Sequence, residues 1–144
     1  MAEAKKKISV KIAKVAVAKS SEPKLNKPAS EALTAAIEAA VAKSSDLTVG
    51  NVTGKDKGFQ IDPTIHEIVY DEKKAELFAR LEMQLDMLPG PKMFTNVTGK
   101  SKFSGINVKK VEKEMADLID EIMKKAGPGL RKALEDKIDG LGGD

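Results

Sequence analysis

Residues able to carry acid–base chemistry are sparse in this chain of 144 residues. His66 is the only histidine, and an imidazole can serve as a general base near neutral pH. The sequence places no serine nucleophile or oxyanion motif to work with it, and the chain has no cysteine. We expect His66 to lie on a strand, with Glu67 on the opposite face, at the surface or rim. We therefore predict no catalytic residue and no enzymatic activity.

The pentapeptide Asn-Val-Thr-Gly-Lys occurs twice, at residues 51–55 and 96–100. Both copies match the acceptor motif for N-glycosylation, and Gly99-Lys-Ser101 matches the end of a phosphate-binding loop. The first glycine of such a loop would stand at position 94, which is Phe94, and no helix is expected after Ser101. We therefore predict a turn or a bulge at both copies, and no nucleotide site.

Carboxylates recur at helical spacing at Glu114, Asp117 and Glu121, where they could attract a cation. Lysines alternate with them in the same segment, which is typical of a solvated helix face. Without cysteine there is also no thiolate ligand. The sequence predicts no metal site and no cofactor.

The basic character of the chain is concentrated near its N-terminus. Residues 1–30 hold eight lysines and two glutamates, whereas the rest holds 17 basic and 20 acidic residues. Such a segment can bind nucleic acid or anionic lipid through charge. No aromatic residues are interleaved with these lysines, so nucleic-acid binding is our second alternative rather than our expectation.

A partner-binding strand edge is the candidate site that the sequence favours. Ile8, Val10 and Ile12 alternate with polar residues, as in a half-buried strand. Lysines on such a strand are typical of an exposed sheet edge, and an exposed edge can pair with a partner. The candidate residues are Ile8, Val10, Lys11, Ile12 and Lys14.

Hydrophobic patterns position the other elements. Apolar residues at four-residue spacing after Pro28 predict a helix that ends near Ser44. A short strand begins at Leu47, and residues 59–70 predict a long strand in which Pro63 marks an edge or a bulge. A change of alternation phase predicts a bulge near Ala13-Lys14.

Residues 75–88 carry conflicting signals. Their composition favours a helix, but positions 77, 79, 81, 83, 85 and 87 are apolar and the positions between them are polar. We predict a strand in which Leu77, Leu81 and Leu85 are buried. Residues 92–103 form the next strand, a helix follows from Asn107, and Gly127-Pro-Gly129 separates it from a last short helix.

These elements predict one α+β domain over residues 1–144. Its antiparallel-dominated sheet has four to five strands with helices packed on one face, in the order β-α-β-β-β-β-α-α. Residues 1–7 form a basic extension and residues 140–144 a frayed tail. No apolar run has the length of a signal peptide or a membrane span, so we expect a cytoplasmic protein, or a periplasmic one if a natural export signal has been removed.

The sequence pattern of three stretches, 57–68, 75–90 and 96–105, resembles that of small bacterial envelope domains. The family includes penicillin-binding-protein activator lipoproteins and the periplasmic part of the curli secretion channel. The resemblance implies a binding or assembly module. We therefore expect a non-enzymatic protein-binding or assembly domain of a bacterial or phage complex, with a protein partner or a homo-oligomer. The first alternative is an enzyme or small-ligand binder with an unrecognised pocket.

Overall fold

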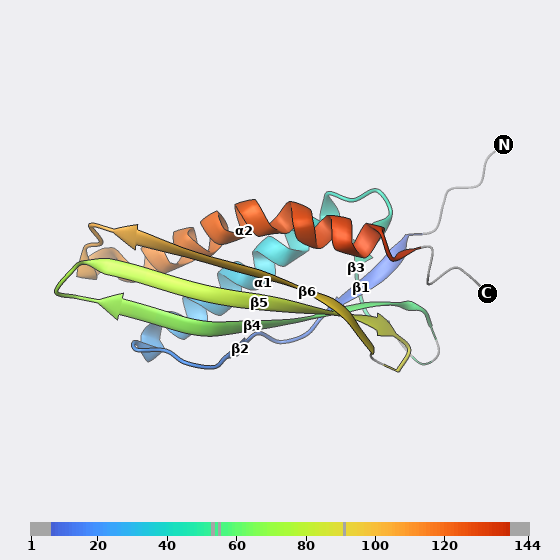
Figure 1. Cartoon of the computed structure of the whole chain (residues 1–144), viewed down its shortest axis with the longest axis horizontal. Coiled ribbons are helices and arrows are strands. Elements are labelled where there is room, and N and C mark those ends of the chain that lie inside the picture. Colours follow the sequence, from blue (N-terminus) through green and yellow to red (C-terminus); the bar gives the residue numbers. More distant parts are fainter. Residues whose placement is uncertain (1–6, 53, 55, 91, 139–144) are drawn as a thin grey trace.

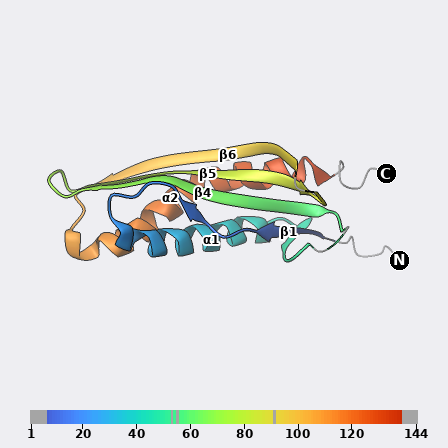
Figure 2. The ribbon, with the colours of Figure 1, turned by 90° about the horizontal axis from the view of Figure 1, so that it is seen from below.

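A computed structural model describes residues 7–52, 54, 56–90 and 92–138, and it shows a long curved sheet with two helices on one face (Figures 1 and 2). The predicted extension 1–7, apart from Lys7, and the predicted tail 140–144 lie outside the described residues. The strands are β1 (Ile8–Ile12), β2 (Ala16–Val17), β3 (Leu47–Val49), β4 (Gly58–Asp71), β5 (Glu76–Leu88) and β6 (Lys92–Ser104). The helices are α1 (Asn26–Ala42) and α2 (Val111–Glu135), each preceded by a short 3₁₀ turn, Pro23–Leu25 and Val108–Lys110.

The sheet has the order β3-β1-β4-β5-β6, and β2 continues beside β4 on the same side as β1. The strands β4, β5 and β6 form an antiparallel meander, whereas β1 runs parallel to both β3 and β4. The expected α+β fold, with an antiparallel-dominated sheet and helices on one face, is confirmed. The two-residue strand β2 brings the number of strands to six.

Residues 75–88 are the strand that their alternation predicts, not the helix that their composition favours. Leu77, Leu81 and Leu85 are fully buried, whereas Arg80 is exposed. Burying these side chains together against the helices outweighs the intrinsic preference of single residues, because helix propensities differ by less than about 1 kcal/mol for ordinary residues.

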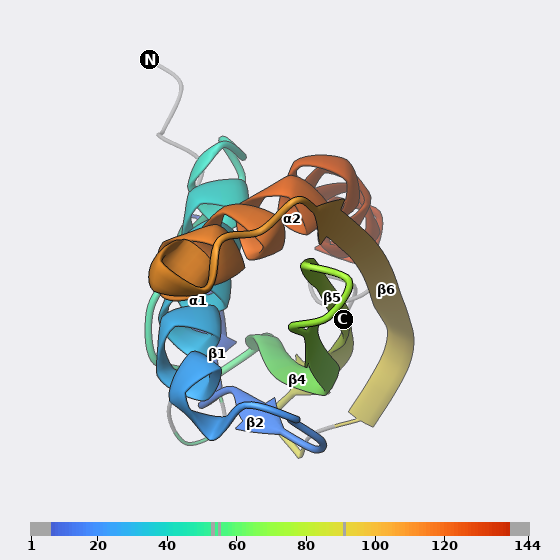
Figure 3. The ribbon, with the colours of Figure 1, turned by 90° about the vertical axis from the view of Figure 1, so that its left-hand side faces the viewer.

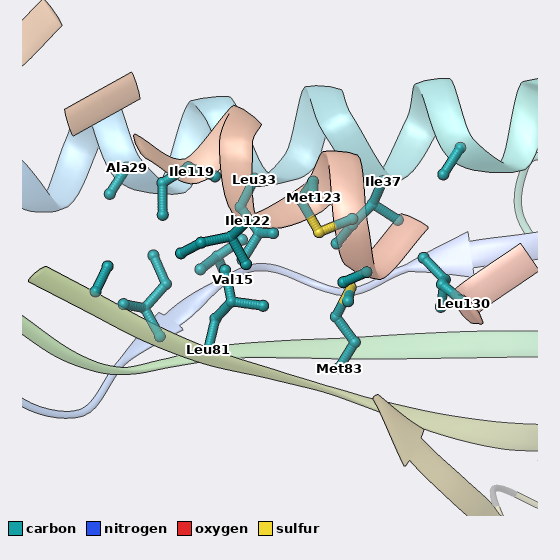
Figure 4. Close-up of a cluster of buried hydrophobic side chains, with 14 of the residues drawn as sticks. Val15, Ala29, Leu33, Ile37, Leu81, Met83, Ile119, Ile122, Met123 and Leu130 are labelled. Carbon is teal, nitrogen blue, oxygen red and sulfur yellow. The ribbon is translucent and has the colours of Figure 1, made fainter. Parts of the chain in front are cut away.

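The core lies between the sheet and the two helices. Figure 4 shows side chains of α1, α2 and β5 that point toward one another, including Leu33, Ile37, Leu81, Ile119 and Ile122. Figure 3 shows from one end how the sheet curves around this core, with β6 at its outer margin. The core is aliphatic apart from Phe59, which also contacts Phe94 with ring centroids 5.7 Å apart.

The prediction that Gly127-Pro-Gly129 ends the C-terminal helix is wrong. A single helix, α2, passes through Pro128, so the two predicted helices are one. Met123, Ala126 and Leu130 are buried on both sides of the proline, and this packing holds the helix together. Proline removes one helical hydrogen bond, to the carbonyl of Lys124.

The predicted bulge near Ala13-Lys14 falls in the gap between β1 and β2, where Ile12 pairs with Ile61 and Ala16 with Thr64, so this side holds one residue more than β4. The gap also explains how Pro63 fits an interior strand. The carbonyls of Ile61 and Ile65 accept hydrogen bonds from Ala13 and Ala18, both 2.9 Å. Because alternate residues of a strand face the same neighbour, Pro63 also faces this segment. The segment is irregular there, so the missing N–H of proline breaks no ladder.

Gly99 provides a test of helix–sheet packing. A β-carbon at this position would lie 2.6 Å from Cγ2 of Ile122 on α2. We expect Gly99→Ala to lower the free energy of unfolding by about 1–3 kcal/mol, the usual cost of overpacking. Urea denaturation followed by circular dichroism measures this.

The matched control is Gly129→Ala, because a β-carbon at Gly129 meets nothing within 4 Å and the residue lies inside α2. This variant should gain up to about 1 kcal/mol from helix propensity. Equal effects of the two substitutions would show that β6 and α2 are not packed as closely as the structure has them.

Candidate functional site

The two helices lie against one face of the sheet (Figure 2). The opposite face carries the polar side chains of β4, β5 and β6. The register places three rows across this face: Gln60 beside Asp86, Asp62 beside Gln84 and Asn96, and Thr64 beside Glu82 and Thr98. Alternation assigns these residues to this face because their neighbours in sequence fill the core. A single surface thus gathers carboxylates, amides, hydroxyls and the only histidine.

His66 owes its position to a β-bulge. The pairing of β4 with β5 shifts between Ile65 and Glu67, so His66 is the extra residue on β4. Its Nε2 lies 2.7 Å from Oε1 of Glu82, and the Asn96 amide donates to the other carboxylate oxygen. The hydrogen bonds from His66 and then from Asn96 hold the pKa of Glu82 below its usual range. The expected rim position of His66 agrees with its 34% exposed side chain. The expectation that Glu67 takes the opposite face is wrong, because the bulge brings Glu67 opposite Arg80 on the polar face.

A second carboxylate cluster lies two rows away. Asp86 is only 3% exposed and hydrogen-bonds to Asp62. The amides of Gln60 and Gln84 donate to Asp62 and Asp86, at 2.8 and 3.2 Å. Burial raises the pKa of Asp86, and so does its hydrogen bond to Asp62, in which the protonated Asp86 donates and the two neighbouring carboxyl groups share one proton.

A hollow of about 650 Å³ separates the segment Ile12–Val15 from helix α1. Asn26, Ser30 and Thr34 line its helical side. Oδ1 of Asn26 is buried and has no hydrogen-bond partner. A second hollow, of about 500 Å³, lies on the polar face and is lined by His66, Arg80, Leu81, Glu82, Thr98, Gly99 and Lys100.

The sequence singled out His66 but missed Glu82, Asn96, Asp62 and Asp86. Alternation within residues 75–88 marked Glu82 and Asp86 as polar positions between buried ones, and only the register and the bulge bring the four residues together.

Strand β1 is not the sheet edge that the sequence predicts. Ile8 and Val10 face β3, and β1 also pairs with β4, so its backbone is bonded on both sides over Ile8–Val10. The reason is that the short segment Leu47–Val49 returns parallel to β1, a non-local pairing that alternation does not reveal. Partner contacts of Lys11, Ile12 and Lys14, which lie beyond β3, stay a prediction.

The repeated pentapeptide has two different structures. In the first copy, Gly54 adopts φ 60°, which fits the predicted turn, whereas Thr53 and Lys55 lie outside the described residues. The second copy lies within β6, so the prediction of a turn or bulge is wrong there; the register shift of β6 falls between its partners Met93 and Thr95 instead. In this copy Val97 and Gly99 face the helices and the residues between them face the other side, so the period-two pattern of β6 continues through the pentapeptide.

The carboxylates Glu114, Asp117 and Glu121 all lie on α2, and Asp117 is exposed. Within the part of the chain that the structure describes, no group of three or more metal-ligating side chains comes together. Also within that part, neither helix has both the length and the apolar composition that crossing a membrane requires.

Comparison with known proteins places the fold among bacterial ones. No protein-family model matches the sequence, and no curated protein matches it. Protein XCC0632 from Xanthomonas campestris has a similar structure, with a TM-score of 0.59 at 12% identity, over 92% of this chain and 89% of that one.

Two further solved structures share the fold. A minor lipoprotein from Acinetobacter baumannii aligns with a TM-score of 0.52 at 11% identity, over 92% of each chain. PelC from Paraburkholderia phytofirmans, solved as a dodecamer, aligns with a TM-score of 0.51 at 11% identity, over 84% of this chain and 87% of that one. The chain therefore has a fold that bacterial lipoproteins and an oligomeric bacterial protein also have.

The carboxyl pair predicts a pH-dependent difference in stability. A pKa raised by folding gives a stabilisation that is complete below the ordinary aspartate value of 3.8 and is lost as the pH rises through the raised value. Asp86→Asn cannot ionise, and its amide can donate to Asp62. The difference in the free energy of unfolding, variant minus wild type, should therefore increase as the pH rises from 3 to about 7.

Glu82→Gln is the matched control with the opposite sign. The lowered pKa of Glu82 gives a stabilisation that is present above its ordinary value of 4.5 and is lost as the pH falls. This variant should lose stability relative to the wild type at neutral pH and approach it in acid. Guanidinium denaturation at several pH values measures both, and parallel pH profiles for the two variants would contradict the assignment.

Proposed function

We propose that this chain is a non-enzymatic assembly domain of the bacterial envelope type, and that it associates with copies of itself through the outer edge of β6. The observation that carries the proposal is the strand β6 itself. It has thirteen residues, Lys92–Ser104, and in the described sheet it pairs with β5 alone. A long open edge presents a row of N–H and C=O groups to any strand that approaches it.

The register identifies which groups face outward. The carbonyls of Ile61 and Ile65 face the β1–β2 side, so the residues between them on β4 face β5. The same alternation applies to β5 and then to β6, whose registers are known. It directs the backbone N–H and C=O groups of Val97 and Gly99 toward β5. The backbone groups of Asn96, Thr98, Lys100 and Lys102 therefore point to the open side.

An antiparallel pairing of two β6 strands fits this pattern when it is centred on Thr98. Two copies of Thr98 then exchange hydrogen bonds, and Lys100 of each copy lies opposite Asn96 of the other. In this register no lysine lies directly opposite another lysine. Shifted registers that bring lysines opposite each other are disfavoured by charge repulsion. Met93, which is 57% exposed on the same strand, adds apolar area near the ends of the contact.

The similar structures support this reading. PelC is described as a dodecamer, so a chain with this fold can assemble with copies of itself. The Acinetobacter protein is a lipoprotein, which supports a place in the bacterial envelope. The resemblance to penicillin-binding-protein activator lipoproteins and to the curli secretion channel leads to the same class of role.

Replacing Thr98 by Pro tests the proposed contact. The Thr98 N–H faces the open side, so proline removes a donor that the isolated chain does not use, and edge strands tolerate proline in this orientation. We expect the wild type to self-associate in sedimentation equilibrium and Thr98→Pro to be monomeric at the same concentration.

Thr98→Ala keeps the backbone N–H and serves as the matched control; it should self-associate like the wild type. Circular dichroism confirms that each variant is folded. A wild type that stays monomeric up to millimolar concentration, or a Thr98→Pro variant that associates unchanged, would rule out self-assembly through this edge.

A further inference from the structure

The hollow on the polar face contains two cations on neighbouring strands. Arg80 on β5 and Lys100 on β6 are directly opposite each other in the register, and both are exposed. Like charges directly opposite on neighbouring strands destabilise a sheet. Neither side chain forms an ion pair with any of the described residues. Arg80 does help to lower the pKa of Glu82, but only as the last of its causes, after the hydrogen bonds from His66 and Asn96.

The nearby carboxylates form hydrogen bonds with other residues or form no ion pair with these cations. Glu82, in the next row, accepts hydrogen bonds from His66 and Asn96 on its two oxygens. Glu67 is opposite Arg80 on β4 but forms no ion pair with it. The residues that line the hollow therefore carry a net positive charge, because Arg80 and Lys100 outnumber the single carboxylate, Glu82.

The same hollow offers groups suited to an oxyanion. A guanidinium presents N–H groups in a planar fork that matches a carboxylate or a phosphate, and an ammonium supplies a point charge. The Thr98 hydroxyl on β6 adds a neutral donor, and the bulge directs His66 into the same space. The volume of about 500 Å³ lies in the range of small-ligand sites.

We propose that this hollow binds a small organic anion through a phosphate or carboxylate group held between Arg80 and Lys100. Thr98 donates to the same group, and Glu82, held by His66 and Asn96, limits the negative charge that the site accepts to one oxyanion group. The proposal is independent of the assembly through β6, because it concerns side chains rather than the open backbone.

The test is a titration of the full chain with inorganic phosphate and, separately, with acetate and citrate, followed by calorimetry. Sodium chloride at the same ionic strength controls for screening. We expect Arg80→Gln/Lys100→Gln to bind the preferred anion at least about tenfold more weakly, because two charge-assisted contacts are lost. The preference between phosphate and the carboxylates identifies the ligand group.

Lys102→Gln is the matched control, since Lys102 lies on the same strand and face but pairs with Glu76 at 3.4 Å. Its affinity should stay within about twofold of the wild type. Thermal unfolding gives a second readout. Without anion, the double variant should have a higher melting temperature than the wild type, because the repulsion between the two cations is relieved. Phosphate should raise the melting temperature of the wild type more than that of the double variant. Equal losses in Lys102→Gln and the double variant, or no binding beyond that of chloride, would overturn the proposal.

Discussion

The burial of one face of the β4–β5–β6 meander beneath two helices is the constraint on which the rest of the structure depends. Ile61, Ile65 and Leu81 are fully buried on this face, and each such side chain contributes about 1.5–3 kcal/mol relative to exposure. A slip of one residue in register would exchange the two faces of a strand. The packing therefore fixes the register, and the register fixes which polar residues meet on the other face.

The close approach of α2 to β6 shows how tight this packing is. Gly99 has no side chain, which leaves room for Ile122 at the centre of the contact. Because α2 must also cover β5, it continues through Pro128 rather than ending there. The helix accepts the loss of one hydrogen bond since ending early would expose Leu130 and Leu134.

The polar face carries costs that a purely structural surface does not need. Asp86 is buried beside another carboxyl group, and Arg80 is opposite Lys100. Both arrangements raise the free energy of the folded state at neutral pH. Such local costs are often found where a surface binds something, and the facing cations lie beside the bulge that repositions His66.

The sequence by itself determined the class of fold, because alternation over residues 75–88 and the helical spacing of Leu33, Ile37 and Val41 are local signals. It also identified β5 correctly, although composition favoured a helix. These signals are reliable here since the periodicity reports which face is buried, and burial supplies most of the free energy.

Only the tertiary structure decided which strand is the open edge and which side chains meet. The pairing of β3 with β1 is parallel and non-local, so nothing near Ile8 or Val10 in the sequence signals it. His66, Glu82 and Asn96 come from three strands, and their contact depends on a register and a bulge. Period-two alternation tells that a residue faces outward but not which residue stands beside it, because neighbours across strands are set by the packing of the whole sheet.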